Sequence, residues 1–222
     1  QLEEEARFLF FTRPRRFGKS LFINMLRAYY DSSKKKDFQT LFGNLWIGKH
    51  PTPLQGAFQV LYLDFSQVGG SIDVVEERFN EYCCICLNDF MDSYGDAYPE
   101  NMRRDFYESK SAGAKLAMLD KKAKAIGLPL YLIIDEYDNF TNTILNEKGE
   151  AVYHAITHAD GFYRDFFKKF KGMFQRIFVT GVSPVTLNDV TSGFNIGWNI
   201  SVKAEYNEML GFSTEDVRVM FN

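Results

Sequence analysis

The residues best suited to chemistry in this chain begin with a short glycine-lysine-serine run. Gly18, Lys19 and Ser20 stand between an apolar stretch, RFLFFT, and a segment whose apolar residues have helical spacing. Backbone N–H groups at the start of a helix bind anions, and a lysine and a hydroxyl there suit phosphates and Mg²⁺. We therefore expect Lys19 to reach β- and γ-phosphates and the Ser20 hydroxyl to bind Mg²⁺.

The run departs from the general phosphate-loop pattern GxxxxGK[ST]. Arg13 occupies the first glycine position, and Pro14 removes a backbone donor and favours extended geometry before it. Two further arginines add positive charge that can compensate in part. An exposed basic turn that caps a helix is the alternative interpretation. If the loop binds a nucleotide, the expected contacts come from Arg15, Arg16, Phe17, Gly18, Lys19, Ser20 and Leu21.

Two carboxylates follow an unbroken apolar stretch in LYLIIDEYD. Asp135 and Glu136 stand where a buried strand should end, and ligands of open α/β sheets bind outside the carboxyl ends of strands. Asp135 is a candidate Mg²⁺ ligand, mostly through water, and Glu136 is a candidate base for an attacking water. Asp138 is a further carboxylate nearby. A solvated acidic turn after a core strand is the alternative.

Other polar residues stand at the ends of further predicted strands. Thr180 ends RIFVT and is a candidate catalytic hydroxyl between the attacking water and the γ-phosphate, or a threonine that merely ends a strand. Asp64 and Ser66 follow another strand, where they can line the substrate side or cap the next helix. Hydrolysis requires Asp135 and Glu136 on the same edge of the sheet as the phosphate loop and Lys19.

The elements that must position these residues alternate between strand and helix patterns. We expect strands at 7–12, 58–65, 129–135 and 176–180. We expect helices at 20–30, 72–92, 114–126 and 162–172, and in the tail, where Ser213 and Asp216 nearly form a capping box. A loop is expected between the third strand and the helix at 162–172, and 31–57 has the pattern of an insertion around a short helix. This alternation predicts a parallel α/β sheet.

Composition limits the class of protein further. A chain of 222 residues with 45% hydrophobic and 25% charged residues is an ordinary globular chain, not a disordered one or a coiled coil. The net charge of −3 argues against a dedicated binder of nucleic acid or anionic membranes. The first residue is not methionine and no signal-peptide pattern follows, so we expect an upstream segment to be missing.

Two groups of potential metal ligands are better explained without a bound metal. The three cysteines within 83–86 lack the partner pair of a zinc site and make a poor disulfide framework, which favours a reducing, cytoplasmic setting. His154 and His158 lack the glutamate of an HExxH motif and a third ligand. The basic residues of 168–176 are more typical of a solvated helix face than of a nucleic-acid patch.

Four motifs in this order, TRPRRFGKS, LDFS, LIIDEYD and FVTGVSPVTLNDVTSGFNI, resemble the predicted AAA-ATPase-like family of bacteria. The resemblance spans residues 7–213, and RPRRFGKS is its most distinctive part. It implies an α/β P-loop NTPase fold: a three-layer sandwich with a mainly parallel sheet of about five strands in additional-strand, AAA- or STAND-like topology. The fourth strand then lies between the phosphate-loop strand and the acidic strand.

The resemblance also implies roles for individual residues. Lys19 and Ser20 match the Walker A pair, Asp135 and Glu136 the Walker B pair, and Thr180 a sensor position. The implied cofactors are ATP and Mg²⁺, and the implied function is a Mg²⁺-dependent ATP-binding and ATP-hydrolysing regulatory module. An arginine at position 13 is no departure from the pattern of this family.

The same resemblance predicts the domain organisation. Residues 1–212 are expected to form an N-terminally truncated ATPase core, and 213–222 to begin a missing lid or C-terminal region. Candidate partners are a second copy or a C-terminal nuclease-like domain of a longer chain, with nucleic acid involved only indirectly and no membrane. Two alternatives stay open: a small-molecule kinase, disfavoured because 183–200 contains no arginine, and a non-catalytic nucleotide-binding interaction module.

Overall fold

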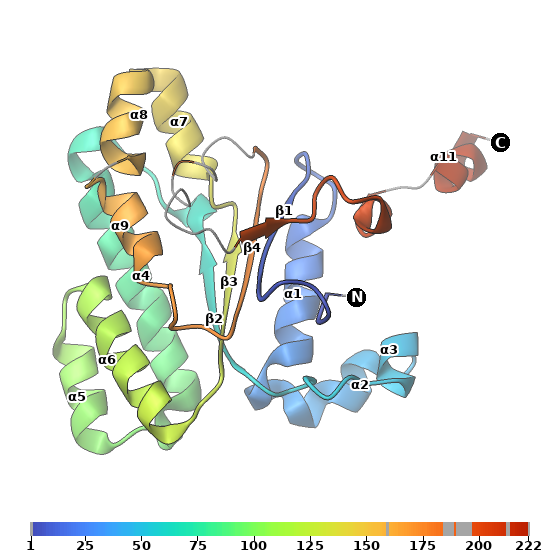
Figure 1. Ribbon diagram of the computed structural model, residues 1–222, viewed down its shortest axis with the longest axis horizontal. Helices are drawn as coiled ribbons and strands as arrows, with labels where there is room; N and C mark the ends of the chain where they lie inside the picture. The colour runs from blue at the N-terminus through green and yellow to red at the C-terminus, as the bar shows by residue number, and fades with distance from the viewer. Residues whose placement is uncertain (1, 159, 184–188, 190–196, 212–213, 222) are drawn as a thin grey trace.

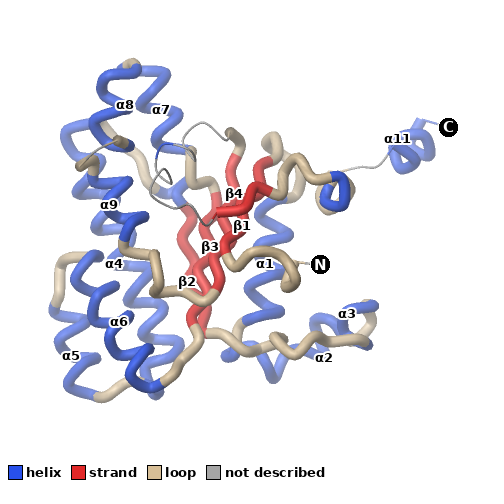
Figure 2. The backbone as a smooth tube through the Cα atoms, in the orientation of Figure 1, coloured by secondary structure: helices blue, strands red, loops and turns tan. Residues whose placement is uncertain are grey.

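A parallel sheet forms the centre of the computed structural model, which describes residues 2–158, 160–183, 189, 197–211 and 214–221. Within these residues the sheet has five strands in the order β2-β3-β4-β1-β5, and every pair is parallel. Figure 2 shows the strands lying side by side between the helices. The strands are β1 Phe8–Thr12, β2 Gln59–Asp64, β3 Leu130–Asp135, β4 Arg176–Gly181 and β5 Gly197–Asn199.

Helices cover both faces of the sheet, which confirms the predicted three-layer sandwich. In Figure 1, α1 lies on one side together with α2 and α3, and α4 to α9 lie on the other. The helix α11 lies apart from both layers in the same view. The helices are α1 Lys19–Tyr30, α2 Phe38–Phe42, α3 Trp46–Lys49, α4 Ile72–Tyr94, α5 Glu100–Glu108, α6 Ala112–Ile126, α7 Asn139–Lys148, α8 Glu150–Thr157, α9 Phe162–Lys168 and α11 Thr214–Phe221.

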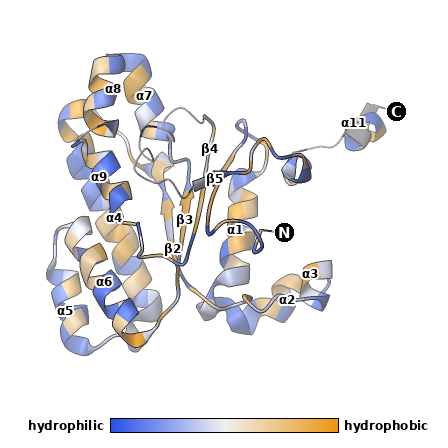
Figure 3. Ribbon diagram, viewed as in Figure 1, coloured by the Kyte–Doolittle hydropathy of each residue, from blue (hydrophilic) through white to orange (hydrophobic). Residues whose placement is uncertain are grey.

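Alternation along the strands explains the two layers. Successive side chains of a strand point to opposite faces, so Leu9 and Phe11 of β1 pack with α1, whereas Phe8 and Phe10 pack in the cluster that contains α4 and α6. The residues of β3 are all buried, as expected for a strand covered on both faces. Figure 3 shows the hydrophobic character of the central strands.

The strand order confirms the additional-strand topology. β4 pairs with β1 through Phe11 and Thr180 and with β3 through Ile134 and Val179, so it separates the strand before the loop from the acidic strand. β5 pairs with the free edge of β1. The carboxyl ends of the parallel strands therefore meet at one edge, where Asp135 and the residues after Thr12 lie.

Several segments differ from the sequence prediction. The loop expected after β3 contains α7 and α8, and the helix expected at 162–172 ends at Lys168 because a run of turns follows, with Gly172 at a φ of 75°. The segment 31–57 contains a 3₁₀-helix and two short α-helices rather than one. The elements α5 and β5 had no predicted counterpart. The capping box expected at Ser213 lies outside the described residues.

The described residues include no candidate membrane-spanning helix. None of the helices in the described ranges combines the length and the apolar character that crossing a bilayer requires.

Candidate active site

The loop between β1 and α1 has the backbone of an anion-binding site. Gly18, the N-cap of α1, has a φ of 83°, and Arg16 also has a left-handed φ of 70°. Turns of this kind direct successive backbone N–H groups into a concave nest. No side chain caps the helix and no acidic residue stands in its first turn. The positive end of the α1 dipole is therefore open to an anion.

Lys19 connects this loop to the acidic strand end. Its residue is only 4% exposed, and its Nζ donates to the Pro14 carbonyl at 3.3 Å. The same Nζ lies 3.3 Å from Oε1 of Glu136. The ammonium is thus held between the loop backbone and a carboxylate, so an incoming phosphate would compete with Glu136 for it.

Ser20 and Asp135, the two predicted Mg²⁺ ligands, are in direct contact. The Ser20 hydroxyl donates to Oδ2 of Asp135 at 2.7 Å, and Oδ1 of the same carboxylate accepts the backbone N–H of Glu136 at 2.9 Å. Hydroxyl and carboxylate oxygens are the donors that Mg²⁺ prefers. The described residues contain no group of three or more His, Cys, Asp or Glu side chains placed to hold a metal ion.

The environment of Asp135 shifts its ionisation. Burial raises the pKa of its carboxyl above the ordinary value, and the nearby charges of Glu136 and Asp64 raise it further. The hydrogen bonds from Ser20 and from the backbone oppose this shift. Burial and the like charges therefore disfavour the charged form of this carboxyl, which a bound cation would favour.

We expect Asp135→Asn to stabilise the nucleotide-free protein at neutral pH. Because the folded-state pKa is raised, the folded protein binds this proton more tightly than the unfolded chain, and stability is lost as pH rises from about 3.9 through the folded value. The amide carries no charge and avoids that loss. Thermal unfolding without Mg²⁺ across this pH range measures the effect. A variant that is less stable than wild type at neutral pH would contradict it.

Glu136 stands in a strained backbone conformation. Its φ is 49°, and in the described part of the chain Glu136 and Arg16 alone combine a side chain with positive φ. Non-glycine residues in this region are uncommon and concentrate at functional sites. The strained pair consists of one residue of the loop and one of the acidic strand end, so both halves of the site store strain.

Thr180 contributes a buried hydroxyl at the same edge. Phe178 packs in the layer of α1, and Thr180, two residues later, faces the same side. It is 1% exposed, and its Oγ1 has no hydrogen-bond partner among the described residues. Buried polar atoms are nearly always paired, so this orphan suggests a ligand or water that completes it.

Asp138 has a structural task that the sequence did not reveal. Its carboxylate is fully buried and accepts the backbone N–H groups of Val182 and Ser183, at 3.1 and 2.6 Å, and the Asn142 amide at 2.9 Å. A Cβ on Gly181 would overlap this carboxylate. With its oxygens occupied in this way, Asp138 fixes the loop after β3 to the end of β4 and is not a free base.

Two arginines that could have served the site are used elsewhere. The Arg13 guanidinium donates to the carbonyls of Ser201 at 2.8 Å and Tyr206 at 3.1 Å, and it lies over the Phe11 ring. Arg176, at the amino end of β4, donates to the carbonyl of Glu3 at 2.7 Å. Arg13 in the first-glycine position therefore fastens the segment after β5 to the loop.

The remaining candidates have local roles. Asp64 accepts the N–H of Ser66 at 3.0 Å and so caps the turn after β2. His158 lies 3.5 Å from Asp189. Burial raises the pKa of the Cys83 thiol well above its usual range, which disfavours a metal-binding thiolate. Of the basic run at 168–176, Lys168 pairs with Asp165 at 2.7 Å on the surface of α9.

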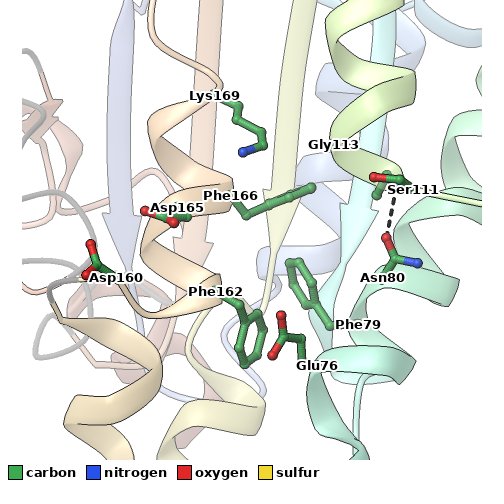
Figure 4. A pocket seen from close by; sticks show the side chains of 11 residues that line it. Glu76, Phe79, Asn80, Ser111, Gly113, Asp160, Phe162, Asp165, Phe166 and Lys169 are labelled. Atoms are coloured by element: carbon green, nitrogen blue, oxygen red, sulfur yellow. Dashed lines mark hydrogen bonds between the residues drawn. The ribbon is translucent and has the colours of Figure 1, made fainter.

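A separate cavity of about 280 Å³ lies in the opposite layer, between α4, α6 and α9. Figure 4 shows Glu76, Asp165 and Lys169 around the rings of Phe79 and Phe166. None of the residues that line this cavity belongs to the loop or to the ends of β3 and β4. It is not part of the candidate active site.

Comparison with known proteins identifies a family for this chain. A family model described as "Predicted AAA-ATPase" matches residues 1–191. A curated protein from Azotobacter chroococcum mcd 1, "Uncharacterized protein in vnfD 5'region", is 26% identical over 239 residues. The alignment covers all of this chain but only 39% of that protein, so the chain spans well under half the length of this relative. No solved structure matches the chain.

Proposed function

Because the chain belongs to the predicted AAA-ATPase family, we propose that it binds ATP with Mg²⁺ and hydrolyses the γ-phosphate, as a regulatory module. The observation that carries the proposal is the pair of contacts between the loop and the acidic strand end. Lys19 meets Glu136 at 3.3 Å, and Ser20 meets Asp135 at 2.7 Å. A phosphate cradle and two carboxylates are thereby joined at one sheet edge.

In this proposal each residue acts on a defined part of the nucleotide. The backbone N–H groups of 16–20 cradle the phosphates, and the Lys19 ammonium leaves Glu136 for the β- and γ-oxygens. Ser20 and Asp135 would hold Mg²⁺, which supplies charge neutralisation on the same oxygens. Glu136 accepts the proton of a water whose oxygen attacks the γ-phosphorus while the bond to the bridging oxygen of ADP breaks. The Thr180 hydroxyl orients that water.

The alternative of a degraded, non-catalytic loop is less favoured by the contacts of Arg13. Its guanidinium points to the carbonyls of Ser201 and Tyr206, so it does not fill the phosphate cradle. The left-handed conformations of Arg16 and Gly18 keep the cradle geometry in place without the first glycine.

We expect Lys19→Ala to weaken Mg·ATP binding by about 1.5–3 kcal/mol, because it removes a charge-assisted hydrogen bond. That loss corresponds to roughly 10- to 100-fold in the dissociation constant. Titration calorimetry with the non-hydrolysed analogue AMPPNP and Mg²⁺ measures it.

Lys121→Ala, which removes an exposed lysine of α6, is the matched control and should bind like wild type. Equal affinity of the Lys19 variant and wild type would mean that the loop is not the nucleotide site.

A further inference from the structure

Tyr163 of α9 reaches the main chain beside Glu136, the proposed base. Tyr163 is fully buried, and its hydroxyl donates a hydrogen bond to the carbonyl of Tyr137. Tyr137 directly follows Glu136, whose backbone is strained at a φ of 49°. A side chain from 26 residues further along the chain therefore holds the peptide next to the base.

Tyr137 is held at three points, and each of them limits how Glu136 can turn. Its backbone N–H donates to the carbonyl of Thr180 at 3.2 Å, and its own hydroxyl donates to the carbonyl of Ser183. The hydrogen bond from Tyr163 is the third point, and it comes from the helix layer opposite α1 (Figure 1). Strained conformations persist only where the surrounding structure over-determines them, and these bonds meet that condition at Glu136.

The ring of Tyr163 is held in place by other rings. It packs edge-on against Phe140 of α7, with ring centroids 4.8 Å apart, and against Phe167 of α9 at 5.0 Å. Phe79 of α4 is a further neighbour at 5.6 Å. Because protein interiors are close-packed, the ring has little room to shift. The hydroxyl is therefore a fixed point to which the carbonyl of Tyr137 is tied.

The corner between α8 and α9 sets the position of Tyr163. Gly161 is the N-cap of α9, and a Cβ there would lie 2.4 Å from the backbone of Ile156 in α8. The Gly161 N–H donates to the carbonyl of His158 at 2.8 Å, and the buried Thr157 hydroxyl donates to that of Tyr153 at 2.9 Å. A glycine thus lets α9 begin directly against the end of α8.

We propose that Tyr163 is a positioning residue, which holds Glu136 in the conformation that lets its carboxylate serve as the base. The inference rests on the proposed ATP hydrolysis and adds to it a residue outside the loop and the strand ends. Without the hydroxyl, the buried carbonyl of Tyr137 loses a donor, and Glu136 can relax toward an ordinary φ. Its carboxylate then leaves the place beside Lys19, whereas the contact of Ser20 with Asp135 is untouched.

Tyr163→Phe removes the hydroxyl and keeps the ring, so it tests the hydrogen bond alone. We expect kcat for ATP hydrolysis to fall by about tenfold to 100-fold, since a misplacement of about 1 Å can cost about 10²-fold. The dissociation constant for Mg·AMPPNP should stay within about twofold of wild type, because the phosphate contacts remain. Tyr98→Phe is the matched control. Its buried hydroxyl donates to Gln59 at 2.6 Å, at the amino end of β2 and away from the site, so its kcat should equal that of wild type.

A merely structural role is distinguished by combining Tyr163→Phe with Glu136→Gln. If the hydroxyl acts through Glu136, its loss should slow single-turnover hydrolysis by less than about twofold in a protein that already lacks the base. Hydrogen exchange of the peptide 135–141, followed by mass spectrometry, gives a readout that does not depend on activity. Exchange should be faster in Tyr163→Phe than in wild type or Tyr98→Phe.

An unchanged kcat or unchanged exchange in Tyr163→Phe would overturn the positioning role alone. The same would follow from equal losses of rate with Glu and with Gln at position 136. Circular dichroism checks folding, and a Tyr163→Phe variant that does not fold would show that the hydroxyl serves the core as a whole, against the proposal. A wild-type protein that neither binds Mg·AMPPNP nor hydrolyses ATP would instead overturn the proposed function.

Discussion

Glu136→Gln is expected to keep ATP bound and to slow its hydrolysis by about 10²- to 10⁴-fold, the usual scale for loss of a general base. The amide has nearly the shape of the carboxylate but cannot accept the proton of the attacking water. It also cannot form the ion pair that holds Lys19 at 3.3 Å in the free protein. The phosphates then meet no competitor for the ammonium, so we expect ATP affinity to be equal to or higher than that of wild type.

Single-turnover phosphate release at saturating ATP and Mg²⁺ measures this effect apart from binding. Asp64→Asn is the matched control, because Asp64 ends the next strand at the same edge and caps a turn that an asparagine oxygen can also cap. This control should retain most of the wild-type rate. Unchanged turnover in the Glu136 variant would exclude Glu136 as the base. Asp138 would not replace it, because backbone N–H groups already occupy its carboxylate.

The second large effect concerns the protein concentration. We expect the chain at high dilution to hydrolyse ATP slowly and to be accelerated by a partner, up to about 10³- to 10⁵-fold, because an arginine supplied in trans can stabilise the transition state by this factor. Arg13 and Arg176 donate to backbone carbonyls elsewhere. The sequence of 181–217 contains no arginine. A second copy, or a segment outside this chain, is the proposed supplier.

Specific activity measured from nanomolar to high micromolar protein tests this directly. A sharper version adds excess Glu136→Gln protein to a trace of wild type. The variant hydrolyses almost nothing itself but still carries every arginine, so it should accelerate wild type if the supplier is a second copy. A rapid rate that does not change with concentration would contradict the proposal. Acceleration only by a longer chain would place the arginine outside residues 1–222.

Most of the sheet could be predicted from the sequence, and β5 could not. The strands β1 to β4 are apolar stretches, and β3 in particular is buried along its whole length. β5 has only three residues, Gly197–Asn199, and all of them are exposed, so it carries no apolar pattern. Its pairing depends on the free edge of β1, which is a tertiary contact. The helices α7 and α8 were missed because polar residues dilute a spacing that Phe140 and Ile144 do show.

The candidate site, like the sheet, could be predicted from the sequence only in part. The contacts of Lys19 with Glu136 and of Ser20 with Asp135 join side chains whose types and spacing already indicated phosphate and metal chemistry. The contacts of Asp138 with the backbone N–H groups of 182–183 gave no such signal. Any residue offers the same backbone groups, so a sequence does not mark which of them a distant side chain will bind. The same reason hid the function of Arg13.

The position of β1 in the sheet has a consequence for biosynthesis. Of the five strands described, β1 is made first, yet its neighbours are β4 and β5, the two that are made last. A nascent chain that ends before Arg176 therefore lacks both strands that flank β1 in the folded sheet, and the apolar residues of β1 stay exposed to solvent or chaperones. The carbonyls that fasten Arg13 emerge later still, at Ser201 and Tyr206. Such distant pairings make folding slow. The phosphate loop, residues 13–20, is therefore completed only after the much later segment that contains Ser201 and Tyr206 has been made.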